Sequence, residues 1–176
     1  MDDFPTRRFS WDELVQIITV DHDLARLRRC LHDQNVYDDY MTNQVRARYH
    51  SVMDFILITK LDVPSQKEGD SSLPSVTKMR AVPVAQVTDA GQVRKRLLRN
   101  DFPYYFATDV DHWILWKLGG GEITLQEIED AKEELRNTLR NVVDTLHWIN
   151  PPALKSIPEI DHVHILCRRA AEENDV

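Results

Sequence analysis

The stretch Asp161–Cys167, which reads DHVHILC, decides the fold of this 176-residue chain. Along an extended strand successive side chains point to opposite faces, so His162 and His164 share one face while Val163 and Ile165 share the other. Two imidazoles side by side can act on one ligand or one metal ion. The alternative is that one histidine is a hydrogen-bonded core group and the other a surface residue.

Two further segments extend the pattern. The run HWILWKL, residues 112–118, predicts a second buried strand, and the three glycines at 119–121 predict a turn after it. Thr124 and Glu127 form a capping box, which predicts a helix. Its apolar residues recur every three or four positions, at Ile128, Ala131, Leu135, Leu139, Val142 and Leu146. We expect Asn150, Pro151 and Pro152 to end that helix.

The N-terminal third has helical patterns at residues 11–18, 24–31 and 37–60, and the first opens with a capping box of Ser10 and Glu13. Polar residues at 62–78, above all from Asp62 to Val76, predict a flexible surface loop. We expect an edge strand at 80–87 and a short helix from Asp89 to Leu98.

Together these elements predict one α+β domain over residues 1–176. It would comprise an N-terminal helical layer (1–61), the flexible loop (62–78) and a small antiparallel sheet with a long crossing helix (79–170). The histidine strand is expected at the centre of that sheet.

Composition excludes several classes of protein. Acidic residues outnumber Lys and Arg by 29 to 22, and the net charge of −7 repels phosphate backbones, so we expect no nucleic-acid partner. Cys30 and Cys167 have no spacing typical of a disulfide framework or a zinc site, which favours a reducing compartment. The N-terminus lacks an apolar signal and no window reaches a membrane-spanning length, so we expect a cytoplasmic protein without membrane contact.

The order of elements from Asn100 onward resembles the histidine-triad (HIT-like) nucleotide-binding proteins. The blocks that carry this resemblance are NDFPYYF (100–106), HWILW (112–116), the helix from Thr124, and EIDHVHILCRR (159–169). The resemblance implies that His162 is the central histidine, which attacks the α-phosphate of a nucleotide, and that His164 contacts the phosphate. Ile160 stands where the family has its first histidine, and Cys167 replaces a common proline.

A second resemblance spans most of the chain. The blocks WDEL (11–14), RNDFPYYF (99–106), HWILW (112–116) and INPPALKSIPEIDHVHIL (149–166) are similar to a family of uncharacterised fungal proteins that includes N-acetylglucosamine-induced proteins. This family brings no established reaction.

Three more residues, Asn100, Arg99 and His112, are candidates for contact with a ligand. Asn100 stands where the related nucleotide-binding folds use an asparagine near the base or ribose. Arg99 closes a basic run (Arg94, Lys95, Arg96) that either holds a phosphate or is a solvated helix face. His112 follows Asp109 and Asp111, and these side chains together with the His162–His164 pair could form a metal site, although aspartates before a strand more often accept backbone hydrogen bonds.

These observations favour a HIT-like hydrolase or transferase that acts on a nucleotide or another phosphorylated metabolite through His162, with a small anionic ligand as partner. Two alternatives stay open. One is a ligand-binding protein without turnover, which the missing first histidine permits. The other is a metal-dependent or cofactor-free tailoring enzyme of fungal metabolism that uses the same two histidines. The sequence indicates no particular cofactor or oligomeric state.

Overall fold

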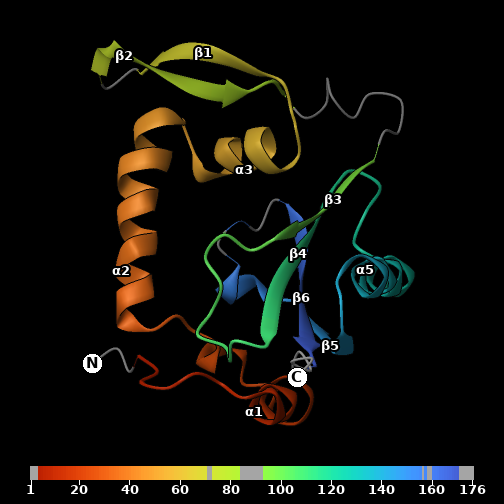
Figure 1. Cartoon of the computed structure of the whole chain (residues 1–176). Coiled ribbons are helices and arrows are strands. Elements are labelled where there is room, and N and C mark those ends of the chain that lie inside the picture. The colour runs from red at the N-terminus through yellow and green to blue at the C-terminus, as the bar shows by residue number, and fades with distance from the viewer. Residues whose placement is uncertain (1–3, 71–72, 84–92, 156, 158–159, 171–176) are drawn as a thin grey trace, which may run out of the picture.

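The computed structural model describes residues 4–70, 73–83, 93–155, 157 and 160–170. Its centre is an antiparallel sheet of four strands, β3 (Arg94–Arg99), β4 (Val110–Leu118), β6 (Asp161–Arg169) and β5 (Val142–Trp148), in the order β3-β4-β6-β5. Helices cover the sheet on both sides (Figure 1). The fold class is therefore α+β, and the histidine strand β6 is an inner strand, as predicted.

The register of β6 against β4 sets the two faces of the sheet. Val163 lies opposite Leu115, and His162 lies opposite Trp116. Val163 and Ile165 are fully buried. The alternation expected for the DHVHILC segment is confirmed, because the apolar residues face one layer of the fold and the two histidines face the other.

Helix α5 (Leu125–Thr138) covers the face that carries Val163 and Ile165 (Figure 1). Its capping box of Thr124 and Glu127 forms as predicted. The buried residues of this layer are Leu115, Ile123, Ile128, Ala131, Leu135, Val163, Ile165 and Cys167. We call this face the α5 face.

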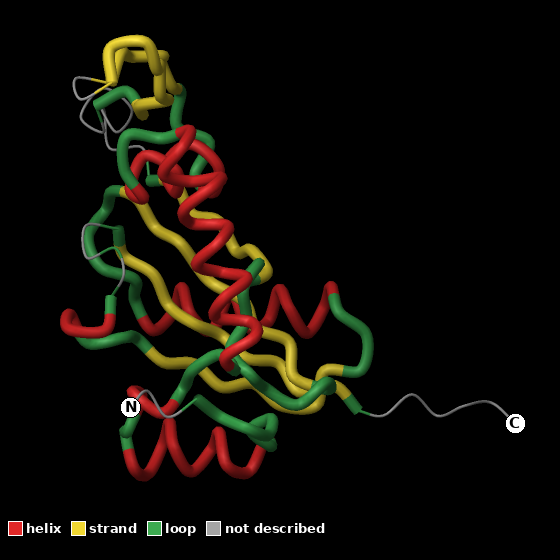
Figure 2. Tube along the Cα trace, turned by 90° about the vertical axis from the view of Figure 1, so that its left-hand side faces the viewer, coloured by secondary structure: helices red, strands yellow, loops and turns green. Residues whose placement is uncertain are grey.

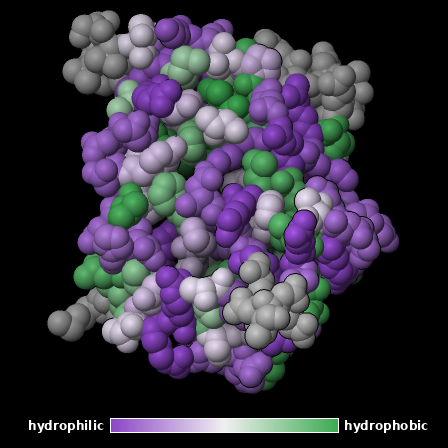
Figure 3. Space-filling view, in the orientation of Figure 1, coloured by the Kyte–Doolittle hydropathy of each residue, from purple (hydrophilic) through white to green (hydrophobic). Residues whose placement is uncertain are grey.

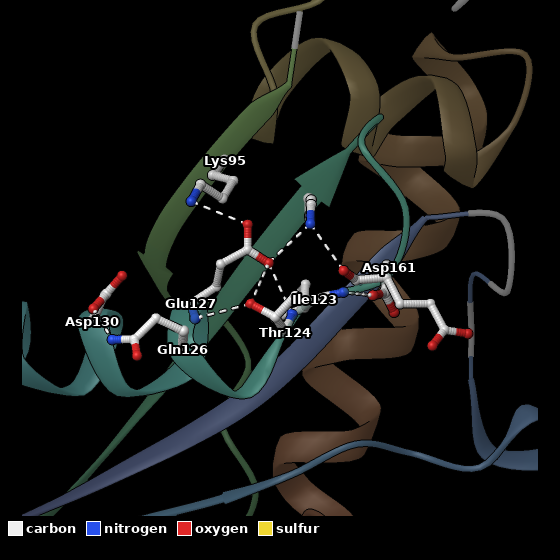
Figure 4. A network of polar contacts seen from close by, with 9 residues as sticks. Lys95, Ile123, Thr124, Gln126, Glu127, Asp130 and Asp161 are labelled. Atoms are coloured by element: carbon white, nitrogen blue, oxygen red, sulfur yellow. Dashed lines mark hydrogen bonds and ion pairs between the residues drawn. The ribbon is translucent and has the colours of Figure 1, made fainter. Parts of the chain in front are cut away.

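A polar network fixes the start of α5 on the sheet (Figure 4). The Glu127 carboxylate accepts hydrogen bonds from the Thr124 backbone N–H and from the Lys117 ammonium, the latter at 2.9 Å. Lys95 of the edge strand lies 3.1 Å from the same carboxylate. The hydrogen bond from Lys117, with those from Thr124 and Lys95, lowers the pKa of Glu127 to about 2.

The predicted length of this helix is wrong. The helix ends at Thr138, and residues 142–148, which continue its apolar spacing, form strand β5. Asn141 adopts a left-handed conformation (φ 60°) that turns the chain, and β5 then pairs with β6. Strand pairing satisfies the backbone of this β-branched segment, so the helical spacing of Val142 and Leu146 is coincidental. Pro151 and Pro152 consequently follow a strand.

The opposite face of the sheet is covered by the N-terminal helices in two separate clusters. Helices α2 (Leu31–Tyr40) and α3 (Val52–Lys60), joined by a π-helical turn (Met41–Arg46), pack on Ile114 and Trp116. Helix α1 (Trp11–Val15), extended by a π-helical turn (Gln16–Asp21), packs on Trp148 and Leu166. Figures 1 and 2 show α1 at one end of the sheet and α3 toward the other. We call this face the histidine face.

The N-terminal helical patterns are confirmed only in outline. The Ser10–Glu13 capping box opens α1 as predicted. The pattern at 24–31 forms only a short 3-10 turn (Leu24–Arg26) before α2. The pattern at 37–60 is interrupted, because Ser51 leaves the helical conformation and its hydroxyl accepts a hydrogen bond from the Asp54 backbone to cap a new helix.

The prediction of a flexible loop at 62–78 is wrong. Most of these residues belong to a hairpin of β1 (Ser65–Asp70) and β2 (Leu73–Ala81). The hairpin lies beyond α3 at one end of the molecule (Figures 1 and 2). It is tied to the helical layer because the Asp54 carboxylate accepts a hydrogen bond from the Ala81 backbone and the His50 backbone N–H donates one to the Met79 carbonyl. Its polar composition fits a two-stranded ribbon with much of its length in water.

The helix expected from Asp89 to Leu98 is also wrong where the structure describes it. Arg94–Arg99 form the edge strand β3, in which Leu97 pairs with Leu115 of β4. Hydrogen bonding along β4 outweighs a weak local helical pattern. Of the edge strand expected at 80–87, Arg80 and Ala81 belong to β2, and residues 84–87 lie outside the described residues.

Hydrophilic and hydrophobic side chains are interspersed over the face of the molecule that Figure 3 presents. Among the residues that the structure describes, no helix has the length and apolar character needed to span a bilayer.

Candidate functional site

A cavity of about 130 Å³ opens on the histidine face, between the sheet and helices α2 and α3. His162 and His164 both line it, so the two imidazoles predicted to share a pocket do so. Its apolar wall consists largely of aromatic rings from both layers, namely Tyr37, Tyr40, Phe55, Phe102, Tyr104 and Trp116. The cavity therefore borders the α2–α3 cluster, and Tyr104, which packs against the α1 cluster, lines it as well.

His162 has one occupied and one free ring nitrogen. Its Nδ1 lies 2.9 Å from the Ile160 carbonyl oxygen, so Nδ1 carries the proton and donates it. Within the described part of the chain, no hydrogen bond reaches Nε2. The Trp116 ring lies against the imidazole, with 5.0 Å between ring centres. In its neutral form His162 thus presents the lone pair of Nε2 in a cavity.

His164 is held at both ring nitrogens. Its Nδ1 lies 2.9 Å from His112 Nε2, and its Nε2 lies 3.2 Å from Asn150 Nδ2. The Trp148 indole stacks on its ring at 4.6 Å with planes only 6° apart, and donates its N–H to Asn150 Oδ1. Aromatic packing and hydrogen bonds therefore fix this imidazole in one orientation.

Burial keeps all three histidines uncharged near neutral pH. Loss of hydration lowers the pKa of His164 to about 3 and the pKa of His112 well below its ordinary value of 6.5. The pKa of His162 is lowered for the same reason, although the hydrogen bond to the Ile160 carbonyl opposes the shift. The histidine face thus provides neutral imidazoles, which can act as hydrogen-bond donors and nucleophiles.

The cationic side chains at the cavity are those of Arg29 and Lys60, with one carboxylate, Asp101. Arg29 donates from Nε and Nη2 to the Phe102 carbonyl and lies over the Tyr37 ring at 4.1 Å. Lys60 pairs with Asp101. The cationic groups outnumber the carboxylates, so the cavity favours an anionic ligand.

The candidate ligand contacts have distinct positions. Asn100 lines the cavity, and its amide is fixed because Oδ1 accepts the Phe102 N–H while Nδ2 lies 3.2 Å from His112 Nδ1. Arg99 is also among the lining residues, but its guanidinium pairs with Asp111 on the α5 face at 2.7 Å. His112, 2% exposed, is behind His164 and is not among the lining residues.

The basic run on β3 does not gather at one point. Arg94 donates to the Leu61 and Asp62 carbonyls, and Arg96 pairs with the Asp62 carboxylate. Lys95 pairs with Glu127 on the α5 face. Of the four cationic residues, only Arg99 is among those that line the cavity, and its guanidinium pairs with Asp111 on the α5 face.

The proposed metal cluster does not assemble. Asp111 and His112 are neighbours on a strand and point to opposite faces, so the Asp111 carboxylate contacts Arg99 and Arg169 instead of the histidines. Within the described ranges, no three histidine, cysteine or acidic side chains lie close enough to hold a metal ion.

Sequence reasoning missed four residues of the site: Arg29, Tyr104, Trp148 and Asn150. Trp148 and Asn150 were assigned to a helix and its end, which hid the fact that β5 runs beside the histidine strand. The alternation Leu146, Trp148, Asn150 is a signal that strand periodicity would have supplied. Arg29 lies in an irregular segment between a 3-10 turn and α2, where no periodicity applies.

Comparison with known proteins places the fold in context. A solved structure titled "Crystal Structure of HTC1" is similar, with a TM-score of 0.56 and 20% sequence identity over 96% of this chain and 89% of the other. At this identity the likeness shows the fold alone. No curated protein matches the chain. A family model described as "Protein of unknown function (DUF3605)" matches residues 10–168, which is most of the chain, and the chain therefore belongs to that family.

Proposed function

We propose that this protein is a hydrolase or transferase that acts on a small phosphorylated metabolite, with His162 as the nucleophile. The observation that carries the proposal is the free Nε2 lone pair of His162 in a cavity, while Nδ1–H is held by the Ile160 carbonyl. A nucleophilic histidine needs this tautomer, neutral and oriented by a hydrogen bond at its other nitrogen. The HIT-like order of elements noted in the sequence supports the same role for His162.

The size of the cavity favours a ligand smaller than a nucleotide. Pockets for drug-sized ligands occupy roughly 300–1,000 Å³, whereas this cavity has about 130 Å³. A phosphoryl group with a short or flat apolar substituent fits this volume and the aromatic wall. The cationic groups of Arg29 and Lys60 favour its negative charge.

The reaction proceeds by transfer of a phosphoryl group. Nε2 of His162 attacks phosphorus, the phosphorus–oxygen bond to the leaving group breaks, and the leaving oxygen takes a proton from water. Water or an acceptor alcohol then attacks the phosphohistidine, which releases the phosphoryl group and restores the neutral imidazole. Near neutral pH the lowered pKa of His162 keeps its lone pair available for the first step.

A second candidate is a binding protein without turnover. Ile160, which stands where HIT-like proteins have their first histidine, is packed in the apolar α2–α3 cluster and is 1% exposed. The cavity therefore receives no third imidazole from that position, which favours ligand binding over rapid chemistry.

Trapping of the covalent intermediate tests the proposal. Incubation with phenyl phosphate or acetyl phosphate is expected to leave a phosphoryl group on His162, stable in alkali and lost in acid, identified by mass spectrometry. His162→Asn removes the label. His147→Asn is the matched control, because His147 is paired with Ile165 and interacts with Lys132 on the α5 face. Ligand-induced stabilisation without any label on His162 favours the binding protein instead.

A further inference from the structure

A series of hydrogen bonds runs from Asn100 through His112 and His164 to Asn150. It has one more N–H donor than its acceptors can satisfy. At one end, the Phe102 N–H occupies Asn100 Oδ1, so the amide NH₂ faces His112. At the other end, the Trp148 indole N–H occupies Asn150 Oδ1, so that NH₂ faces His164. Turning either amide over would set its NH₂ against another N–H.

The neutral rings of His112 and His164 lie between these two fixed donors. Nε2 of His112 is 2.9 Å from Nδ1 of His164. If His112 accepts from Asn100, its own proton is on Nε2 and is donated to His164 Nδ1. The His164 proton is then on Nε2, where it meets the NH₂ of Asn150. The opposite assignment moves the clash to Asn100, so one end of the chain always has two donors and no acceptor.

Protonation does not relieve the surplus. An imidazolium carries a second N–H, which adds another donor, and burial already lowers the pKa of both rings. The Asn150 side chain also hydrogen-bonds with Tyr104, but this contact supplies no acceptor between Asn150 and His164. The two ends of the series differ in access. His164 and Asn150 both line the cavity, whereas His112 is buried behind them.

We infer that His164 and Asn150 form a binding site for one acceptor oxygen of the substrate. This oxygen accepts hydrogen bonds from both His164 Nε2–H and Asn150 Nδ2–H. The two nitrogens are 3.2 Å apart, so a single oxygen can lie at ~2.9 Å from each. The class of ligand is an oxyanion, either a phosphoryl or a carboxylate group. This site deepens the proposed function, because His162 lines the same cavity. The phosphoryl group as ligand rests on that proposed function.

The site distinguishes ligand groups that accept hydrogen bonds from those that donate them. An acceptor oxygen satisfies both N–H groups, whereas an ammonium group adds further donors to a place that has too many. Phenyl phosphate and benzoate should therefore bind, and benzylamine, which has a similar ring but only donors to offer, should not.

Nitrogen NMR of the protein with ¹⁵N-labelled histidine tests this directly. With phenyl phosphate or benzoate bound, His164 is expected to carry its proton on Nε2 and to show no protonation near neutral pH. A bound state with the His164 proton on Nδ1, binding of benzylamine as tight as that of benzoate, or no binding of either anion would overturn the inference. Binding of benzoate alone identifies a carboxylate as the ligand group.

Asn150→Asp supplies the missing acceptor within the chain and adds a negative charge. The affinity for phenyl phosphate and benzoate is expected to fall by at least about tenfold, because the Asn150 N–H is removed and the new carboxylate accepts the N–H of His164. Asn35→Asp makes the same change at an exposed position on α2 and should leave affinity unchanged. The tautomer of His164 in the unsubstituted protein decides the matter if Asn150→Asp does not fold.

The two proposals fail separately. Anion binding with the predicted His164 tautomer but no phosphohistidine on His162 refutes the nucleophile and keeps the oxygen site. A phosphohistidine on His162 with unchanged anion affinity in Asn150→Asp refutes the oxygen site and keeps the nucleophile.

Discussion

The two faces of strand β6 differ in what packs against them. On the α5 face, one amphipathic helix covers Val163 and Ile165 with a continuous apolar cluster. On the histidine face, two separate helical clusters pack on the sheet, and the cavity lies between the sheet and helices α2 and α3. The same strand therefore contributes a closed core on one side and an accessible site on the other.

This difference shows how a site can be both rigid and open. Strand β6 has a neighbour on each side and a buried apolar face, so its backbone is fixed by interactions that lie outside the cavity. The fixed backbone also fixes the positions of His162 and His164, as the side chains of a functional site require. Substitutions on the α5 face should therefore affect stability, and substitutions on the histidine face should affect chemistry.

The largest expected effect is on the α5 face. Ile165→Ala should lower the free energy of unfolding by about 2–5 kcal/mol, because Ile165 is fully buried and the helix cannot collapse onto the space left behind. His162→Asn should cost only about 1 kcal/mol, the worth of its hydrogen bond to the Ile160 carbonyl. Urea unfolding of both variants measures the contrast, and equal losses would show that the two faces do not differ as described.

Acid should destabilise the protein through the histidine face. His164 has a pKa of about 3 when folded and an ordinary value of 6.5 when unfolded. The unfolded chain therefore binds protons more readily, and the free energy of unfolding falls as the pH drops below about 6.5. At pH 5 His164 alone accounts for about 2 kcal/mol.

The window between pH about 6.5 and 5 isolates this effect, because carboxylates titrate mostly below it. Urea midpoints across that window should fall with pH in the unsubstituted protein and fall less in His164→Gln. His32→Gln, on an exposed position of α2, is the control and should keep the full slope. A flat profile in the unsubstituted protein is incompatible with neutral buried imidazoles.

The smallest expected effects concern the polar network that holds α5. Lys117 and Lys95 contact the same Glu127 carboxylate, but the Lys117 side chain is 4% exposed and that of Lys95 is 45% exposed. Lys117→Met should lower the free energy of unfolding by about 1–2 kcal/mol, whereas Lys95→Met should lower it by less than about 1 kcal/mol. Thermal unfolding at low and high salt separates the two, since salt screens only the exposed pair. Equal losses would mean that burial does not distinguish the two lysines.

Local rules predicted those parts of the fold in which one pattern dominates. The alternation in DHVHILC predicted both faces of β6, and the two capping boxes predicted the first residues of α1 and α5. The rules failed where a segment fits two patterns. Val142 and Leu146 match a helical spacing, but pairing with β6 determines their structure.

The same limit explains which site residues could be predicted. His162 and His164 share a strand face through a period of two residues, which the sequence shows directly. Arg29 and Asn150 reach the cavity from segments 121 positions apart, brought together by packing that no local pattern records. The proton surplus depends on four side chains that lie in or just after four different strands, so only the folded structure reveals it.

The most direct test of this account is the protonation of His162 and His164 in the ligand-free protein, followed by nitrogen NMR between pH 8 and 5. We expect His162 to carry its proton on Nδ1 and to keep a free lone pair on Nε2 near neutral pH, while His164 stays neutral throughout that range. A proton on Nε2 of His162 near neutral pH, or titration of His164 near its ordinary value of 6.5, would contradict it.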